Sequence, residues 1–291
     1  MHPHCATRLH SAAGAIILGS MSFAHGPIRP RPAPVAHPSP VAQRPGRTLL
    51  ALLGVLAPIP LAMLLALWLE IDALALAGIG VSLGLASWML WLRGASWAHL
   101  GLRGGISRHR LLLTVLPAVG VLLVVNVLLG RLLAALGLSP DLSRFAFLRG
   151  NLLGLVVMLV VVWTVAAFGE EMLFRGVLMN SLADLLRPRA GARLGWALAL
   201  VVTSAVVGAG HAYYGPAGVI ITGVLGAGFG LVYLVARRNL WAPILTHGLF
   251  DTVAFVALYV SLNRPEPVSS LLGNPGAALC VFFSPGVALM A

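Results

Sequence analysis

From residue 48 onward the sequence repeats one pattern, in which long apolar runs are separated by short stretches rich in Arg, Gly and Pro. A helix needs about 20 apolar residues to cross a bilayer. Seven runs meet that requirement, and we expect spanning helices at 48–69, 73–92, 111–133, 152–186, 195–214, 217–236 and 240–262. A further run, 276–290, contains Pro285 and is short for a span. The pattern therefore predicts an all-α fold, a polytopic transmembrane bundle of seven or eight helices without strands, because open sheets do not cross lipid.

Glycines mark two places in this pattern. The run 152–186 is too long for one upright helix, so it predicts either a strongly tilted helix or a break near Gly169. In the run 217–236, Gly226 and Gly230 have the spacing that lets two membrane helices approach closely. The same glycines do not indicate a dinucleotide-binding loop, because no strand precedes them.

Residues 1–47 form a separate block. The stretch from Pro27 to Pro45 is rich in Pro, Arg and His and has too few apolar residues to bury a core. We expect a disordered N-terminal extension at 1–47 and a transmembrane helical domain at 48–291. Residues 12–24 also have the features of a signal-peptide core, which is the alternative interpretation of this block.

Composition and charge support a membrane protein. The chain is 59% hydrophobic and only 9% charged, whereas a soluble domain carries about 25% charged residues. All nineteen basic residues are Arg, and they are spread over short loops and the N-terminal block rather than gathered in one patch. This distribution indicates membrane orientation and argues against nucleic acid as a partner. Because the N-terminal block and the loop 93–110 are rich in arginine, we expect both segments on the cytoplasmic side. The acidic turn at Glu70 and Asp72, which lies between them in the sequence, is then expected outside. The Arg- and Ala-rich composition suggests a GC-rich genome, so we expect a bacterial cytoplasmic membrane.

A small set of ionisable residues lies inside the apolar runs. It comprises Glu170, Glu171, Arg175, His211, His247 and Asp251. Each such residue costs about 2.5–3.5 kcal/mol at membrane depth on insertion scales. Because separate burial would be very unfavourable, we expect these side chains to share one polar pocket between the helices.

Their spacing indicates different roles. Glu171 and Arg175 are four residues apart and can pair on one helix face, while Glu170 is rotated by about 100° and is left free to act as a base. His247 and Asp251 are also four residues apart and share a face. Small residues precede His211, so another helix or a substrate backbone can come close to it.

A glutamate with two histidines can activate water in two ways. A divalent metal, with zinc the preferred candidate, could be held by His211 and His247 together with a carboxylate, which leaves a position for water. Without a metal, Glu170 could take the proton directly while His211 positions the water, and His247 with Asp251 could stabilise the oxyanion. The one Gly-x-Ser-x-Gly spacing, at 80–84, lies inside the apolar run 73–92 rather than between a strand and a helix, so it does not indicate a serine nucleophile. The sequence His-Glu-x-x-His does not occur.

Over residues 95–262 these motifs resemble the CPBP family of intramembrane proteases, which includes CAAX prenyl endopeptidases and proteins linked to bacteriocin immunity. Glu170, Glu171 and Arg175 match its Glu-Glu-x-x-x-Arg motif, and His247 with Asp251 matches its His-x-x-x-Asn/Asp motif. His211 matches the histidine of its Phe-x-x-x-His motif, although Val207 replaces the phenylalanine. The stretch 100–103, Leu-Gly-Leu-Arg, is similar to the element that precedes the family's third helix.

The resemblance implies a helical bundle with a conical cavity that opens to the cytosol and the membrane. It implies Glu170 as general base, His211 and His247 as water or metal ligands, and Asp251 as a group that assists the oxyanion or a ligand. We therefore expect an intramembrane endopeptidase that cleaves a membrane-associated peptide or protein near the cytoplasmic face. The alternatives are a non-catalytic immunity or scaffold protein of the same fold and a proton or ion carrier. The sequence leaves the substrate and the oligomeric state open.

Overall fold

The structure is a computed structural model that describes residues 45–69, 73–102 and 105–263. The chain divides into two units, residues 1–37 and 38–291, and every described residue belongs to the second unit. Most of the predicted N-terminal extension, residues 1–44, lies outside the described residues, and so does the apolar run 276–290. Within the second unit the first helix begins at Pro45, slightly before the predicted boundary.

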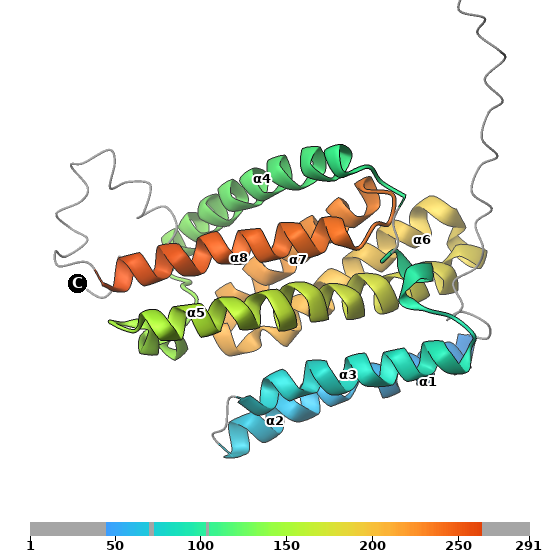
Figure 1. The fold of residues 1–291 in the computed structure, drawn as a ribbon, viewed down its shortest axis with the longest axis horizontal. Helices are drawn as coiled ribbons and strands as arrows, with labels where there is room; N and C mark the ends of the chain where they lie inside the picture. Colours follow the sequence, from blue (N-terminus) through green and yellow to red (C-terminus); the bar gives the residue numbers. More distant parts are fainter. Residues whose placement is uncertain (1–44, 70–72, 103–104, 264–291) are drawn as a thin grey trace, which may run out of the picture. The chain divides into compact units, whose positions relative to one another are not determined.

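The described residues form helices and turns and contain no strand (Figure 1). This confirms the predicted all-α fold. The α-helices are α1 (Pro45–Leu56), α2 (Pro58–Leu69), α3 (Ala73–Leu92), α4 (Arg108–Ala135), α5 (Leu152–Val161), α6 (Asn180–Gly210), α7 (Gly215–Val235) and α8 (Trp241–Leu262). Short 3₁₀-helices are η1 (Trp97–Leu100), η2 (Ser143–Leu148) and η5 (Ala212–Tyr214). Two π-helical segments, η3 (Val162–Glu170) and η4 (Met172–Met179), join α5 to α6.

Six helical segments of the described residues are long and apolar enough to span a membrane. The longest, Leu152–Gly210, has 59 residues and contains Gly191 with φ 77° and ψ 167°, which is not helical. At 1.5 Å per residue, one straight helix of that length would be about three times as long as the hydrocarbon core of a bilayer is thick. The non-helical Gly191 therefore divides it into two crossing segments, which gives seven spans in agreement with the prediction.

The expected break near Gly169 is not where the chain turns. The helix continues past Gly169 into η4, and only its hydrogen-bonding pattern changes to the wider π-helical one. Gly169 instead allows close packing, because a Cβ there would lie 2.6 Å from Cγ2 of Ile79 on α3. π-helical turns are rare and are often found at functional sites, and these two flank Glu171.

The α6–α7 contact depends on glycine, as the spacing predicts. A Cβ on Gly208 of α6 would lie 2.7 Å from the carbonyl oxygen of Val219 on α7. A Cβ on Gly226 would lie 3.3 Å from Cγ1 of Val207, and one on Gly230 would meet Leu200. The absence of side chains at these positions lets the two helices approach closely.

The spans alternate between two ends of the unit. At the first end, which we call the basic end, the nitrogen of Leu240 donates to the carbonyl of Gly101 at 3.0 Å. At the same end Nε1 of Trp241 donates to the carbonyl of Leu102 at 3.0 Å, and Arg238 lies over the Trp196 ring, 5.5 Å from its centroid. The loops α3–α4 and α7–α8 and the turn within α6 therefore meet here, on the right in Figure 1.

The second end, which we call the opposite end, collects the other connections. The nitrogen of Asp141 donates to the carbonyl of Tyr214 at 3.0 Å, and the rings of Phe145 and Phe255 lie 5.1 Å apart. The loop α4–α5, the turn α6–α7 and the later part of α8 are thereby brought together. Each span thus runs from one end to the other.

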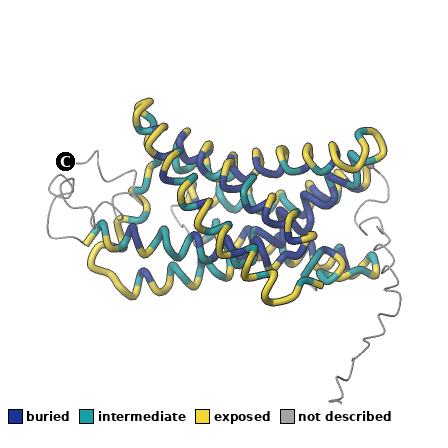
Figure 2. The backbone as a smooth tube through the Cα atoms, turned by 90° about the horizontal axis from the view of Figure 1, so that it is seen from above, coloured by how far each residue is buried: buried dark blue, intermediate teal, exposed yellow. Residues whose placement is uncertain are grey.

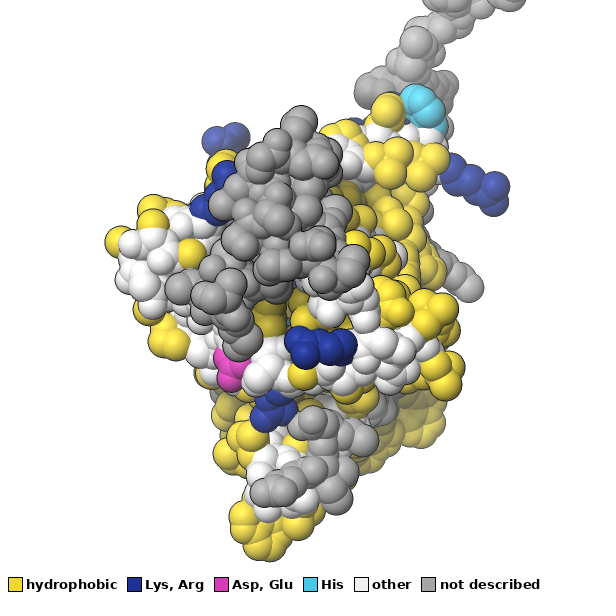
Figure 3. Space-filling view, turned by 90° about the vertical axis from the view of Figure 1, so that its left-hand side faces the viewer, with side chains coloured by type: hydrophobic (Ala, Val, Ile, Leu, Met, Phe, Trp, Pro, Cys, Tyr) yellow, Lys and Arg dark blue, Asp and Glu magenta, His cyan; other side chains and the backbone are white. Residues whose placement is uncertain are grey.

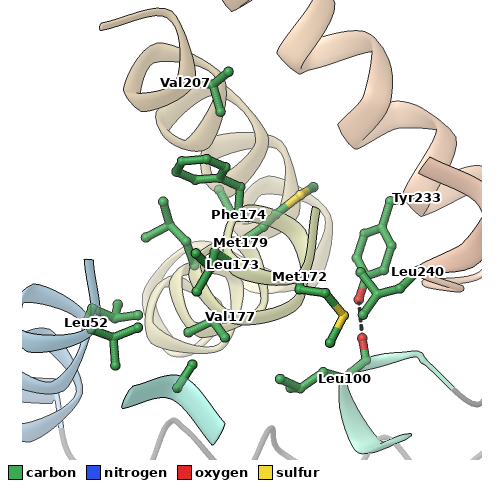
Figure 4. Close-up of a cluster of buried hydrophobic side chains, with 14 of the residues drawn as sticks. Leu52, Leu100, Met172, Leu173, Phe174, Val177, Met179, Val207, Tyr233 and Leu240 are labelled. Carbon is green, nitrogen blue, oxygen red and sulfur yellow. Dashed lines mark hydrogen bonds between the residues drawn. The ribbon is translucent and has the colours of Figure 1, made fainter. Parts of the chain in front are cut away.

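The largest buried cluster surrounds η4. Its members come from several helices and include Leu52, Leu100, Met172, Leu173, Phe174, Val177, Met179, Val207, Tyr233 and Leu240 (Figure 4). Along the other helices buried and exposed positions alternate (Figure 2). The exposed positions include large apolar side chains such as Trp68, Leu153 and Val235, which are 79%, 73% and 72% exposed, and hydrophobic side chains form much of the visible surface in Figure 3. Such faces are stable against lipid and would be unstable against water.

Candidate functional site

A cavity of about 650 Å³ lies between the helices. Five of the six ionisable residues singled out in the sequence line it, namely Glu170, Arg175, His211, His247 and Asp251. They come from η3, η4, the residue that follows α6, and α8, so the cavity gathers residues that are up to 81 positions apart in the sequence. The sixth, Glu171, is fully buried behind the wall. The structure therefore places the set in one region, while the catalytic role of each residue stays a prediction.

Glu171 anchors two of the cavity residues. Its Oε1 accepts a hydrogen bond from Nη1 of Arg175 at 2.7 Å and is 2.9 Å from Nδ1 of His247. Glu171 and Arg175 are 0% and 1% exposed. A buried carboxylate is stable only when opposite charges and hydrogen bonds compensate it. The local pair expected from the i, i+4 spacing is present, and it is extended by a histidine 76 residues further along the chain.

Helix α7 holds the other side of this group. Nη2 of Arg175 donates to the carbonyl oxygen of Gly226, and the guanidinium carbon lies 5.8 Å from the centroid of the Phe229 ring. The same ring stacks on His247, with centroids 4.4 Å apart and an interplanar angle of 16°. Phe229 therefore fixes the plane of the imidazole while Glu171 fixes its Nδ1.

The remaining nitrogen of His247 faces Asp251. Nε2 of His247 lies 3.4 Å from Oδ2 of Asp251, one helical turn further along α8. Asp251 is partly exposed, whereas His247 is buried. Because Nδ1 is held by Glu171, Nε2 is the ring atom that can form a hydrogen bond with a group in the cavity. Asp251 competes with such a group for Nε2.

His211 is oriented by its own helix. It follows the last residue of α6, and its Nδ1 lies 2.8 Å from the carbonyl oxygen of Val207. A carbonyl only accepts, so Nδ1 carries the proton and Nε2 has a free lone pair. His211 can therefore accept a hydrogen bond from water or coordinate a metal through Nε2. The position of Val207, where the family has phenylalanine, is buried against α7.

Glu170 stands apart from the hydrogen-bonded group. It lines the cavity, is partly exposed, and interacts electrostatically with His211 and His247. Among the described residues none forms a hydrogen bond with its carboxylate. One glutamate of the Glu170–Glu171 pair is thus locked into the packing, and the other is available to a group in the cavity.

Whether this site can bind the expected metal ion depends on how closely its donor atoms are grouped. Within the described part of the chain, no three His, Cys, Asp or Glu side chains are close enough together to hold a metal ion. Nδ1 of His247 already contacts Glu171, and Nδ1 of His211 already contacts Val207. The donor set in this arrangement does not fit a metal centre, so a zinc site stays a prediction.

Sequence reasoning missed several residues that build the site. Asn180 donates through Nδ2 to the carbonyl of Arg175 at 2.7 Å and to the hydroxyl of Tyr233 at 2.8 Å. That hydroxyl donates to the carbonyl of Leu100 at 3.1 Å (Figure 4). Asn180 and Tyr233 are buried polar residues, and their place in apolar runs is the one signal that points to them. Phe229 had no such signal, because an aromatic residue in an apolar run is ordinary core.

Comparison with known proteins adds one finding. Residues 152–253 match a family model described as type II CAAX prenyl endopeptidase Rce1-like. No curated protein and no solved structure gives a significant match. The matched stretch begins at α5 and ends in α8, and it contains the motif residues Glu170, His211 and His247. Over this stretch the chain is therefore similar to Rce1-like type II CAAX prenyl endopeptidases, which confirms the family suspected from the motifs.

Proposed function

We propose that this multi-pass membrane protein is an endopeptidase that hydrolyses a peptide bond in a membrane-associated peptide or protein, with Glu170 as general base. One observation carries the proposal: the same cavity is bordered by an unengaged carboxylate, Glu170, and by two histidines with fixed orientations. A base, a water-positioning group and a hydrogen-bond donor are the parts that peptide hydrolysis requires. The family match over residues 152–253 supports the same reaction class.

In the proposed reaction Glu170 takes a proton from a water molecule that also donates to Nε2 of His211. The resulting hydroxide attacks the carbonyl carbon of the scissile bond. The negative charge that develops on the carbonyl oxygen is stabilised by the Nε2–H of His247. Glu170 then gives its proton to the leaving nitrogen, the C–N bond breaks, and a carboxylic acid and an amine are released.

Glu171 and Arg175 act through His247 in this scheme. Because Glu171 accepts from Nδ1 of His247, a charge on the imidazole is balanced by a buried carboxylate 2.9 Å away. Arg175 donates to the same oxygen of Glu171 at 2.7 Å and so fixes its position. These are positioning residues, because neither reaches a reacting atom except through His247.

The cavity wall indicates which substrates fit. Apart from the ionisable group, it is lined largely by apolar residues, and its outer parts come from α2, α3 and η2. Members of this outer wall include Ile59, Met63, Ile79, Phe145 and Phe147. An apolar peptide segment leaves lipid for such a wall at little cost, whereas a charged one does not. The proposed substrate is therefore a segment rich in apolar side chains.

The experiment compares two carboxylate-to-amide changes. Glu170→Gln should abolish cleavage of a fluorogenic peptide anchored in proteoliposomes, because the amide cannot take a proton from water. Asp184→Asn is the matched control: Asp184 lies on α6 near Arg187, 3.9 Å from its guanidinium, and outside the cavity wall. This control should retain activity. Full cleavage by the Glu170→Gln variant would remove the proposed mechanism.

Zinc dependence is a finer proposal with a separate test. Metal content of the purified protein is measured for the native chain and for the His211→Ala/His247→Ala double variant. One equivalent of zinc in the native chain that is lost in the variant would support a metal site formed by a closer grouping of these donors. No zinc in active native protein would assign the activation of water to Glu170 alone.

A further inference from the structure

The cavity lies in one half of the bundle. Helix α8 begins at the basic end, and the residues that it contributes run from His247 to Leu258, from its middle to the opposite end. Helix α3 begins at the opposite end, and it contributes only residues near its start, from Ala75 to Ile79. The loop α4–α5 and the turn α6–α7, which lie at the opposite end, supply Pro140, Arg144, Tyr213 and Tyr214. The cavity therefore extends from the level of His247 toward the opposite end.

Arginines are distributed very unequally between the two ends. Nine of the described arginines lie at or near the basic end: Arg47, Arg93, Arg108, Arg110, Arg187, Arg189, Arg193, Arg237 and Arg238. Three lie toward the opposite end: Arg131, Arg144 and Arg149. The adjoining sequence agrees with this difference, because Arg44 directly precedes α1 and Arg103 lies between η1 and α4, whereas Arg264 follows α8.

Acidic residues outside the cavity show no such excess at the basic end. Asp184 lies toward the basic end, whereas Asp141 lies in the α4–α5 loop at the opposite end. Glu70 and Asp72 fall in the sequence between α2 and α3, and Glu266 follows α8. Acidic residues contribute little to orientation by themselves, so the arginines decide it. The short loops that contain those arginines are the kind to which the positive-inside rule applies.

From this asymmetry we infer that the basic end faces the cytoplasm and that the cavity with Glu170 is reached from the other side of the membrane. The inference rests on the proposed function and deepens it, because it specifies the substrate class. The substrate is a peptide or protein segment in the leaflet facing away from the cytoplasm, or one entering that leaflet from outside the cell. A cytoplasmic segment would have to pass the closely packed basic end, where Leu100, Tyr233 and Leu240 are buried.

This orientation differs from the expectation that the family resemblance raised, which was a cavity open to the cytosol. The physical reason lies in this chain's own arginines. Reversing the orientation would move the arginine-rich loops out of the cytoplasm, which the positive-inside bias opposes. The turn between the two parts of α6 carries three of those arginines, Arg187, Arg189 and Arg193, so the bias extends into the second half of the chain.

Two alanines, one at each end, provide a matched test of orientation. Ala146 lies in η2 at the opposite end, Ala192 lies in the turn of α6 at the basic end, and both are exposed. Each is changed to cysteine in a full-length chain in which the two native cysteines, Cys5 and Cys280, are replaced by serine. A membrane-impermeant maleimide is then added to intact bacterial cells that express the protein, before and after the membrane is permeabilised.

Ala146→Cys should be labelled in intact cells, and Ala192→Cys only after permeabilisation. The reverse result would overturn the inference, and so would labelling of both residues in intact cells. This readout does not depend on enzymatic activity, so it stands even if the protein proves not to be a protease.

A second experiment connects orientation to substrate. A fluorogenic apolar peptide is added to the outside of sealed, right-side-out membrane vesicles. Cleavage without opening the vesicles, lost in the Glu170→Gln variant, is the expected result. Cleavage that appears only after the vesicles are opened would contradict the inference and leave the proposed function intact. A lack of cleavage in both conditions would count against the proposed function, while the labelling result would still decide the orientation.

Discussion

Adjacent glutamates with opposite surroundings allow a sharp prediction about Glu171. This side chain is fully buried, and its Oε1 receives both Arg175 Nη1 at 2.7 Å and His247 Nδ1 at 2.9 Å. Glu171→Gln keeps the shape of the side chain but removes its charge. The guanidinium of Arg175, 1% exposed, is then left without its buried counter-charge.

The magnitude follows from the two contacts. Breaking a buried ion pair by removing one partner costs about 3–5 kcal/mol. Part of this cost is offset, because Arg175 still donates to the carbonyl of Gly226 and still lies over Phe229. We therefore expect Glu171→Gln to lower the free energy of unfolding by about 3 kcal/mol. Adding Arg175→Met, which removes the stranded charge, should recover about 2 kcal/mol as a coupling energy.

The assay is reversible denaturation in mixed micelles with increasing SDS, followed by the fluorescence of the seven tryptophans. Glu170→Gln is the matched control, since it makes the same chemical change one residue earlier at a partly exposed site. Its effect on the free energy of unfolding should stay within about 1 kcal/mol. Glu170→Gln should therefore remove activity and spare stability, whereas Glu171→Gln should reduce stability.

Two results would refute this reasoning. Equal losses of stability in Glu170→Gln and Glu171→Gln would mean that the ion pair does not hold the fold. Additive losses in the Glu171→Gln/Arg175→Met double variant would mean that the two residues are stabilised independently of one another.

Three further substitutions test particular close contacts. Gly101 has φ 112°, and a Cβ there would collide with a backbone carbonyl of the α7–α8 loop, so Gly101→Ala should lower the SDS midpoint of unfolding. Gly105 has open space around it, so the control Gly105→Ala should leave that midpoint unchanged. In α8, Gly248→Ala would bring a Cβ to 2.6 Å from the Trp163 ring, so the emission of that tryptophan should shift relative to native protein; an unchanged spectrum would contradict the contact. Phe229→Leu removes the ring that stacks on the imidazole of His247. An aromatic pair contributes about 1.4 kcal/mol, so kcat should fall roughly tenfold with little change in KM. A roughly tenfold rise in KM would instead indicate a role in binding substrate.

The spans were predictable because lipid imposes a length on apolar runs. The prediction of 73–92 coincides with α3, and that of 240–262 differs from α8 by one residue. The turn at Gly191 was not predictable in the same way. A glycine that permits close packing, such as Gly169, and a glycine that permits positive φ look identical in sequence, and only the packed neighbours distinguish them.

In the site, local pairs were predictable and distant ones were not. The pairing of Glu171 with Arg175 follows from i, i+4 spacing, as does the approach of His247 to Asp251. The contact between Glu171 and His247 spans 76 residues and depends on how α8 packs against η4. Periodicity alone contains no information about that register. The sequence could therefore only suggest that the two glutamates have different roles, and the structure supplied their different positions.

The turn at Gly191 also sets the register of the two halves that it joins. Glu170 lies 21 residues before Gly191, and His211 lies 20 residues after it. The two arms of this helical hairpin are nearly equal in length, which brings two residues 41 positions apart to the same cavity. An insertion in one arm would shift Glu170 relative to His211 along the helix axis. An insertion at the hairpin tip would leave the two residues at the same depth. Variation in length is therefore tolerable at the tip, and any lengthening of one arm requires an equal lengthening of the other.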